Sequence, residues 1–156
     1  MEQIEHTIME TMTFLRYGDP LERNQQWLLN QIESVELQET AKKLSILSIQ
    51  VLIEIAKDLN QNATDIANTL NVTRGGVSRI AKRLIQEDLI KEIRKKENLK
   101  EIHYQLTIKG QDIYKVQLKL IEKINYEHLK IIQSFSKEEQ QTIAKYLKQV
   151  SQLSIE

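Results

Sequence analysis

Cations and hydroxyl groups recur at helical spacing near the middle of this chain. Arg74, Ser78 and Lys82 follow one another at intervals of four residues, with Arg79 beside them. On an α-helix this spacing places the first three on one face and Arg79 on its flank. Guanidinium, ammonium and hydroxyl groups donate hydrogen bonds, and the cations attract anions. Such a face can bind phosphate groups and the edges of bases.

A short preceding helix is predicted over residues 63–70. Asn62 is predicted to be its N-cap, and Asp65 three residues later completes a variant of the capping box. Asn71 tolerates the left-handed conformation that ends such a helix. Apolar residues on one face of this helix predict that it packs on a core. They are Ile66, Ala67 and Leu70.

The basic helix itself is predicted to begin after Thr73, which can act as its N-cap. Val77, Ala81 and Leu84 form an apolar stripe opposite the basic face. Two short helices joined by a tight turn, the second with a basic outer face, are typical of a helix-turn-helix. That motif presents its second helix to the DNA major groove.

The distribution of charge supports an anionic partner, although the net charge of the chain is zero. Between Arg74 and Lys109 there are ten Lys or Arg and five Asp or Glu, a local balance of +5, so the remainder carries −5. Charges beyond a Debye length of about 8 to 10 Å are largely screened, so a nearby polyanion senses the local balance.

A β-hairpin, or wing, is predicted to follow the basic helix. Residues 89–94 can form one strand, residues 95–100 a turn, and residues 101–106 a second strand with alternating polar and apolar side chains. A basic hairpin tip can lie along a phosphate backbone or enter a minor groove. The lysines expected at this tip are Lys95, Lys96 and Lys100.

Further amphipathic helices flank this region, each with an N-cap signal. Ser45 and Thr107 can each cap a helix, and Ser136 with Glu139 makes a capping box for a last one. Another apolar stripe, Ile4, Ile8, Met12 and Leu15, precedes a break at residues 18–20. Terminal helices that are remote in sequence and apolar usually pack on one another or on a second copy. We expect a homodimer, whose two-fold symmetry would match a palindromic operator.

Several classes of protein are disfavoured. The chain has no cysteine, no apolar run long enough for a membrane span and no signal peptide, so a cytoplasmic protein is expected. No set of nucleophile, base and orienting group is recognisable, so an enzyme is not expected. His6, His103 and His128 lack metal-ligand spacing, and no cofactor is implied. Aromatic residues that could line a ligand pocket, or simply the core, are Phe14, Tyr17, Trp27 and Tyr114.

The order of helix, helix-turn-helix, wing, long helix and final helix resembles the MarR family of bacterial transcriptional regulators. The matching motifs are Leu44-Ser45 with Val51-Leu52, Ile66-Ala67-x-x-Leu70-x-Val72-Thr73, Arg74-Gly75-x-Val77-Ser78-Arg79-x-x-Lys82-x-Leu84, and Leu106-Thr107-x-x-Gly110. The resemblance implies a winged-helix dimer that binds palindromic DNA. It also implies a small-molecule effector bound between the dimerisation helices and the DNA-binding lobe.

One departure from the family pattern stands out. The family usually carries Asp-x-Arg in the wing, where this chain has Asn98-Leu99-Lys100. Lys is less suited than Arg to a narrow minor groove, so generic phosphate attraction is expected there. Some zinc-responsive relatives have clustered His early in the long helix, whereas this chain has Gln111, Ile113 and Val116. Zinc sensing is therefore disfavoured.

The sequence thus predicts a mainly α (α+β) fold with three parts. Residues 1–43 and 108–156 would supply N- and C-terminal dimerisation helices, and residues 44–107 a winged helix-turn-helix lobe. The expected function is a ligand-responsive repressor, with a protein-interaction module or a small-molecule carrier as alternatives. Residues expected to contact double-stranded DNA are Thr64, Thr73, Arg74, Gly75, Ser78, Arg79, Lys82, Lys95, Lys96, Asn98 and Lys100.

Overall fold

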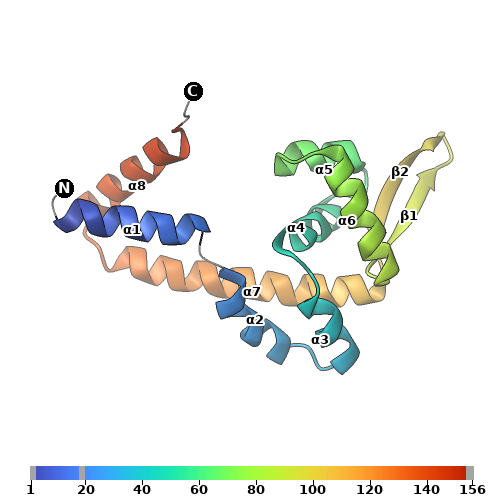
Figure 1. Cartoon of the computed structure of the whole chain (residues 1–156), viewed down its shortest axis with the longest axis horizontal. Helices are drawn as coiled ribbons and strands as arrows, with labels where there is room; N and C mark the ends of the chain where they lie inside the picture. The colour runs from blue at the N-terminus through green and yellow to red at the C-terminus, as the bar shows by residue number, and fades with distance from the viewer. Residues whose placement is uncertain (1–2, 18–19, 154–156) are drawn as a thin grey trace. The chain divides into compact units, whose positions relative to one another are not determined.

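The computed structural model describes residues 3–17 and 20–153, with side chains except at positions 16, 17, 20–23 and 95. It divides into two compact units after Leu118. The elements are α1 Gln3–Tyr17, α2 Pro20–Asn30, α3 Val35–Lys42, α4 Ile46–Lys57, α5 Ala63–Leu70, α6 Arg74–Gln86, β1 Ile90–Lys95, β2 Asn98–Leu106, α7 Ile108–Gln133 and α8 Lys137–Ser151 (Figure 1). Helices with one small antiparallel sheet confirm the predicted fold class.

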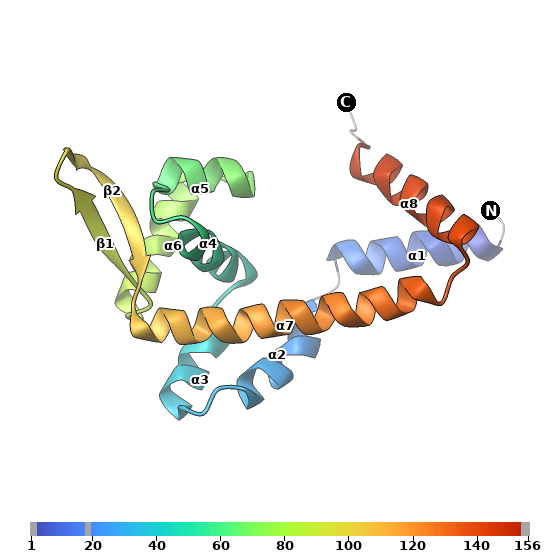
Figure 2. The same ribbon diagram turned by 180° about the vertical axis from the view of Figure 1, so that it is seen from behind.

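The core of the helix-turn-helix region in the first unit is formed by α4, α5 and α6. These helices contact one another, β2 contacts α4 and β1 contacts α6 (Figures 1 and 2). Each of these three helices contributes at least one side chain that is 0% exposed, namely Leu52 from α4, Ile66 from α5, and Val77 and Leu84 from α6. This core holds the two helices of the motif at a fixed angle.

Local capping sets the boundaries of α5 and α6, as the sequence predicted. The Asn62 and Asp65 side chains make both bonds of a capping box, and Asn71 ends α5 in the left-handed region with φ of 53°. The Thr73 hydroxyl accepts a hydrogen bond from the Gly76 N–H at 3.1 Å. Capping therefore leaves only the residues between Leu70 and Arg74 to make the turn.

The wing has a tighter turn than the sequence predicted. Lys95 pairs with Asn98, so Lys96 and Glu97 form a two-residue turn, and residues 98–100 belong to β2. The prediction of a turn over residues 95–100 was wrong because alternation of polar and apolar residues marks only the half-buried part of a strand. The pairing also has an irregularity between Ile93 and Lys95, which breaks that alternation near the tip.

The base of the wing is held to the start of α7 by a close backbone approach. A Cβ built on Gly110 would lie 1.9 Å from the Leu89 carbonyl oxygen, so only glycine fits there without movement. The Thr107 hydroxyl accepts a hydrogen bond from the Gly110 N–H at 3.1 Å and donates one to the Asp88 carbonyl. The predicted N-cap at Thr107 is confirmed, and it also ties α7 to the end of α6.

The N-terminal region contains one helix that the sequence analysis did not separate. Ser34 caps α3 by accepting a hydrogen bond from the Leu37 N–H at 3.3 Å, and Ile32 is buried in the connection from α2. The predicted helix at the N-terminus is confirmed as α1. Its apolar residues Ile4 and Leu15 are 71% and 67% exposed.

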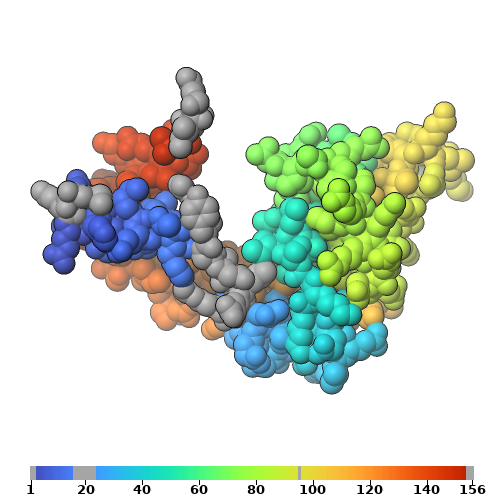
Figure 3. All heavy atoms as spheres, in the orientation of Figure 1, coloured from blue at the N-terminus to red at the C-terminus, as the bar shows by residue number. Residues whose placement is uncertain are grey.

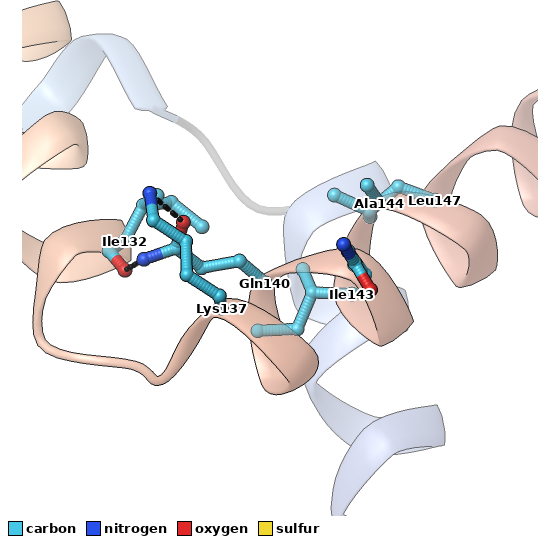
Figure 4. A pocket seen from close by; sticks show the side chains of 7 residues that line it. Ile132, Lys137, Gln140, Ile143, Ala144 and Leu147 are labelled. Atoms are coloured by element: carbon cyan, nitrogen blue, oxygen red, sulfur yellow. Dashed lines mark hydrogen bonds between the residues drawn. The ribbon is translucent and has the colours of Figure 1, made fainter.

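The second unit contains the later part of α7 and all of α8. The predicted capping box of Ser136 and Glu139 is confirmed at the start of α8. No described residue of α8 is buried. Apolar and polar side chains instead line an open hollow, where Gln140 donates a hydrogen bond to the Ile132 carbonyl (Figure 4). Gln140 also donates one to the Phe135 carbonyl. The residues lining the hollow are Ile132, Lys137, Gln140, Gln141, Ile143, Ala144 and Leu147.

None of the helices in the described part of the chain combines the length and apolar character needed to cross a membrane.

Candidate nucleic-acid interface

The outer face of α6 carries the residues that the sequence analysis placed there. Arg74, Arg79 and Lys82 are exposed and Ser78 is half-buried. The opposite stripe of the helix is buried in the core, as predicted. The helix therefore presents three cations to solvent on a rigid support.

The N-terminus of α5, the start of α6 and the wing border one hollow of about 370 Å³. In Figure 3 the surfaces of α5 and α6 (green) continue into the surface of the wing (yellow). Five of the predicted site residues line the hollow, namely Thr64, Arg74, Ser78, Asn98 and Lys100. Its other lining residues are Asn62, Ala63, Glu101, Ile102 and Tyr104. Residues from three elements, up to 42 positions apart (62 to 104), thus meet at one place.

Thr73, Gly75 and Gly76 form the first turn of the basic helix and its cap. The Thr73 oxygen is engaged by the Gly76 N–H, and a Cβ on Gly76 would lie 3.1 Å from that oxygen. A Cβ on Gly75 would meet nothing within 4 Å. Packing within the chain therefore gives no reason for glycine at 75, which leaves room for a partner to approach the backbone.

The tip of the wing is basic and lies in solvent. Lys96, Asn98 and Lys100 are exposed, while the side chain of Lys95 lies outside the part that the structure describes. Arg94 donates a hydrogen bond from Nη1 to the Leu99 carbonyl at 2.7 Å, across the hairpin. The guanidinium of Arg94 thus stiffens the tip, a role that its place in the predicted first strand did not reveal.

Tyr104 forms part of the floor of the hollow and is 6% exposed. Burial raises the pKa of its hydroxyl, and the nearby Glu92 carboxylate raises it further, while Arg74 acts in the opposite direction. The phenol is therefore neutral at neutral pH and keeps its proton for donation.

Glu101 and Asn62 were not among the predicted site residues, yet both border the hollow. The Asn62 amide donates a hydrogen bond to the Glu101 carboxylate at 2.5 Å, and the Asn98 amide donates another at 3.2 Å. No periodic pattern marks such a contact, because its partners lie 39 residues apart. The only feature of the sequence that could have drawn attention to Glu101 was its position as an acid beside Lys100 in a basic wing.

The aromatic residues considered for a ligand pocket are not gathered in one place among the described hollows. Phe14 lines a shallow groove on α1 with His6, Met9, Glu10 and Thr13. Trp27 and Tyr114 are half-buried, and neither lines a hollow described here. The side chain of Tyr17 lies outside the described part of the chain.

Candidate metal ligands are dispersed in the same way. The described residues contain no group of three or more His, Cys, Asp or Glu side chains able to hold a metal ion. His6 pairs with Glu10 at 3.2 Å, and His103 is buried 3.7 Å from Glu101.

Known proteins are similar to this chain in the sequence of the lobe and in the fold. The model of the MarR family matches residues 44–102. The HTH-type transcriptional regulator PchR of Bacillus subtilis (strain 168) is 32% identical over 107 residues, which span 69% of this chain but only 63% of PchR. FabT of Streptococcus pneumoniae in complex with DNA gives a TM-score of 0.71 at 22% identity, covering 95% of both chains. A Lactococcus lactis ZitR mutant in complex with DNA gives 0.70 at 23% identity, covering 96% of this chain and 93% of ZitR.

Proposed function

Because the chain belongs to the MarR family, we propose that it is a sequence-specific DNA-binding transcriptional regulator. The observation that carries this proposal is the exposed basic face of α6, which joins a hollow shared with the wing. A helix with a hydrogen-bonding outer face, backed by a fully buried stripe, suits the major groove in width and chemistry. The local balance of +5 between Arg74 and Lys109 supplies attraction for the phosphates.

The proposed contacts divide by their chemistry. The residues on the cap and outer face of α6 would face the major groove, namely Thr73, Arg74, Gly75, Ser78, Arg79 and Lys82. Phosphate contacts would come from Thr64, at the N-terminus of α5, and from the wing lysines Lys95, Lys96 and Lys100. Asn98 is a further DNA-binding candidate in the wing. Lysine ammonium groups attract phosphates as point charges with little geometric demand, so the wing would add affinity more than specificity.

We propose further that the regulator is a homodimer. Residues 1–43 and 108–156 would supply the dimerisation helices and residues 44–107 the DNA-binding lobe. Exposed apolar side chains at both ends support this division, with Ile4 71% and Leu129 52% exposed in the single chain. A two-fold axis would place two copies of α6 on the half-sites of a palindromic operator.

Repression follows from the same arrangement. Bound protein would exclude the polymerase, and a small-molecule effector would change the separation of the two copies of α6. Phe14, Tyr17, Trp27 and Tyr114 are the aromatic candidates for that effector's site. The proposal assigns the chain a binding role without catalysis, and places it in the cytoplasm with the chromosome.

The test is a fluorescence anisotropy titration with DNA flanking the chain's own gene, repeated across salt concentrations. Arg79→Ala should weaken specific binding about 10- to 100-fold, because a good base contact contributes about 1–3 kcal/mol of discrimination. Lys145→Ala removes the same charge from α8 and should leave affinity within about twofold, because its charge lies outside the basic segment.

The salt series separates this function from the alternatives. A DNA-binding protein should show log affinity falling linearly with log salt concentration. A folded protein that binds no DNA at low salt would overturn the proposal and favour a protein-interaction module. A ligand that changes Trp27 fluorescence while leaving DNA affinity untouched would argue for a carrier.

A further inference from the structure

Glu101 places a carboxylate inside the surface proposed to bind DNA. It lines the same hollow as Arg74 and Lys100, and its side chain is 38% exposed. A negative charge at this place opposes the approach of phosphates, since the repulsion is strongest within a Debye length of about 8 to 10 Å. An acid here weakens DNA binding unless it contributes something else.

The contacts of Glu101 indicate what it contributes. Its Oε1 accepts a hydrogen bond from the Asn62 amide at 2.5 Å, and its Oε2 accepts one from the Asn98 amide at 3.2 Å. Asn62 is the cap of α5, and Asn98 is the first residue of β2 after the turn of the wing. One carboxylate therefore joins the helix-turn-helix to the wing tip.

The two amides extend this connection into the backbone on each side. The oxygen of Asn62 accepts hydrogen bonds from the Thr64 and Asp65 N–H groups at 2.8 and 3.0 Å. The oxygen of Asn98 accepts one from the Lys100 N–H at 3.3 Å. A continuous series of hydrogen bonds thus runs from the first turn of α5, through Glu101, to the backbone that carries Lys100.

The chemistry of each position suits this series. An amide accepts through its oxygen and donates through its nitrogen, whereas an ionised carboxylate only accepts. Asn98 can therefore accept from the Lys100 backbone and donate to Glu101, which an aspartate at position 98 could not do. The wing needs such support, because an isolated two-stranded hairpin is marginally stable in water.

We propose that Glu101 is a positioning residue: its carboxylate holds the wing against the N-terminus of α5, so that Lys100 and Lys96 lie where DNA phosphates pass. The inference rests on the proposed DNA-binding function. Its two consequences have opposite signs, because the charge of Glu101 repels DNA while its hydrogen bonds order the wing.

Two matched variants separate these consequences. Glu97 is an exposed acid in the turn of the same wing, and Glu97→Gln and Glu101→Gln each remove one negative charge. Glu97→Gln should leave DNA affinity unchanged or strengthen it about twofold, because it only reduces repulsion. Glu101→Gln should weaken DNA binding about fivefold or more, because the neutral amide offers one acceptor oxygen for the two donors and its remaining hydrogen bond is no longer made to a charged group. Its log-salt slope should also become shallower, since fewer phosphates are neutralised. Equal or tighter binding by Glu101→Gln would overturn the inference.

Asn62→Ser removes the amide donor while retaining a good helix cap. It should weaken DNA binding in the same direction as Glu101→Gln. The double variant should bind DNA little more weakly than the single variant with the larger loss, because both substitutions act on the same connection between Asn62 and Glu101. Fully additive losses would overturn the connection through Asn62.

Amide hydrogen exchange in the DNA-free protein tests the connection independently of function. In Glu101→Gln the Lys100 amide should exchange about tenfold faster, while the core amide of Ala81 keeps its protection. Unchanged exchange at Lys100 would overturn the positioning role. Faster exchange at Lys100 with a wild-type protein that binds no DNA would overturn only the proposed function.

Discussion

The helix-turn-helix lobe buries its apolar side chains more completely than the last helix of the chain does. In the lobe, Leu52, Ile66 and Leu84 are all 0% exposed. In α8, built from the same kind of amphipathic sequence, no described residue is buried and Leu147 is 49% exposed. The lobe completes its core within one chain, whereas the apolar face of α8 stays half-buried or exposed in the part of the chain that the structure describes.

This difference assigns DNA binding and dimerisation, which the proposed function combines, to different parts of the chain. Burial of apolar surface is worth about 25 cal/mol per Å², so an exposed apolar stripe favours association with another surface. The groups that would read DNA stand on the completed lobe, and the groups that would set the spacing of two lobes stand on the incomplete helices. DNA chemistry and dimer geometry should therefore respond to different mutations.

The largest loss of stability is expected from a substitution in the core of the lobe. Leu52→Ala should lower the free energy of unfolding by about 2–5 kcal/mol, because a fully buried leucine leaves a cavity when it is truncated. Urea denaturation followed by circular dichroism measures this change. Leu147→Ala is the matched control on α8 and should cost less, with an effect that shrinks as the protein is diluted. Equal losses at all concentrations would show that α8 is as complete as the lobe.

A smaller but more specific effect is expected from charge on the exposed stripe. Leu147→Glu should shift the protein from dimer toward monomer in sedimentation velocity, because an unpaired charge would have to be buried at the interface. Lys148→Glu places an acid at the adjacent exposed position and should leave the dimer intact. A Leu147→Glu protein that remains dimeric would remove α8 from the proposed interface.

The features predictable from the sequence are those fixed within a few residues. The caps at Asn62, Thr73 and Ser136 were all predicted, because a capping side chain bonds to a backbone N–H two or three positions away. The inward stripe of α6 was predicted because helical periodicity repeats along the helix. These local rules were enough to place the basic face of α6 outward.

The features that were not predictable depend on residues far apart in the chain. Asn62 meets Glu101 across 39 positions, and Gly110 meets Leu89 across 21. Neither contact has a periodic signature, since each follows from how the wing folds back on the lobe. The helix α3 was missed for another reason: Leu37 and Ala41 are its only apolar side chains that are buried, so its apolar face is weakly marked in the sequence.

The smallest effect on stability is expected from an ion pair between α3 and α7. In the sequence, α3 precedes the lobe and α7 follows it. Lys109 Nζ lies 2.6 Å from Glu36 Oε1. The hydrogen bond from Lys109, followed by its charge, lowers the pKa of Glu36 from its ordinary value of 4.5. The hydrogen bond to Glu36 raises the pKa of Lys109 above 10.5, and burial opposes that shift. The pair is accessible to water, with the Glu36 side chain 77% exposed, so screening keeps its contribution small.

The signs of these two shifts define a window of pH. The lowered pKa of Glu36 gives stability that is present above pH 4.5 and is lost as pH falls through the pKa of the folded state. The raised pKa of Lys109 gives stability that is complete below pH 10.5 and is lost as pH rises through the folded value. Glu36→Gln should therefore lower the urea midpoint slightly at pH 7, and its difference from the wild type should shrink as the pH falls below 4.5. Glu33→Gln, the same change three residues earlier, is the control. If Glu36→Gln and Glu33→Gln behave alike at pH 7, the ion pair does not stabilise the attachment of α3 to α7.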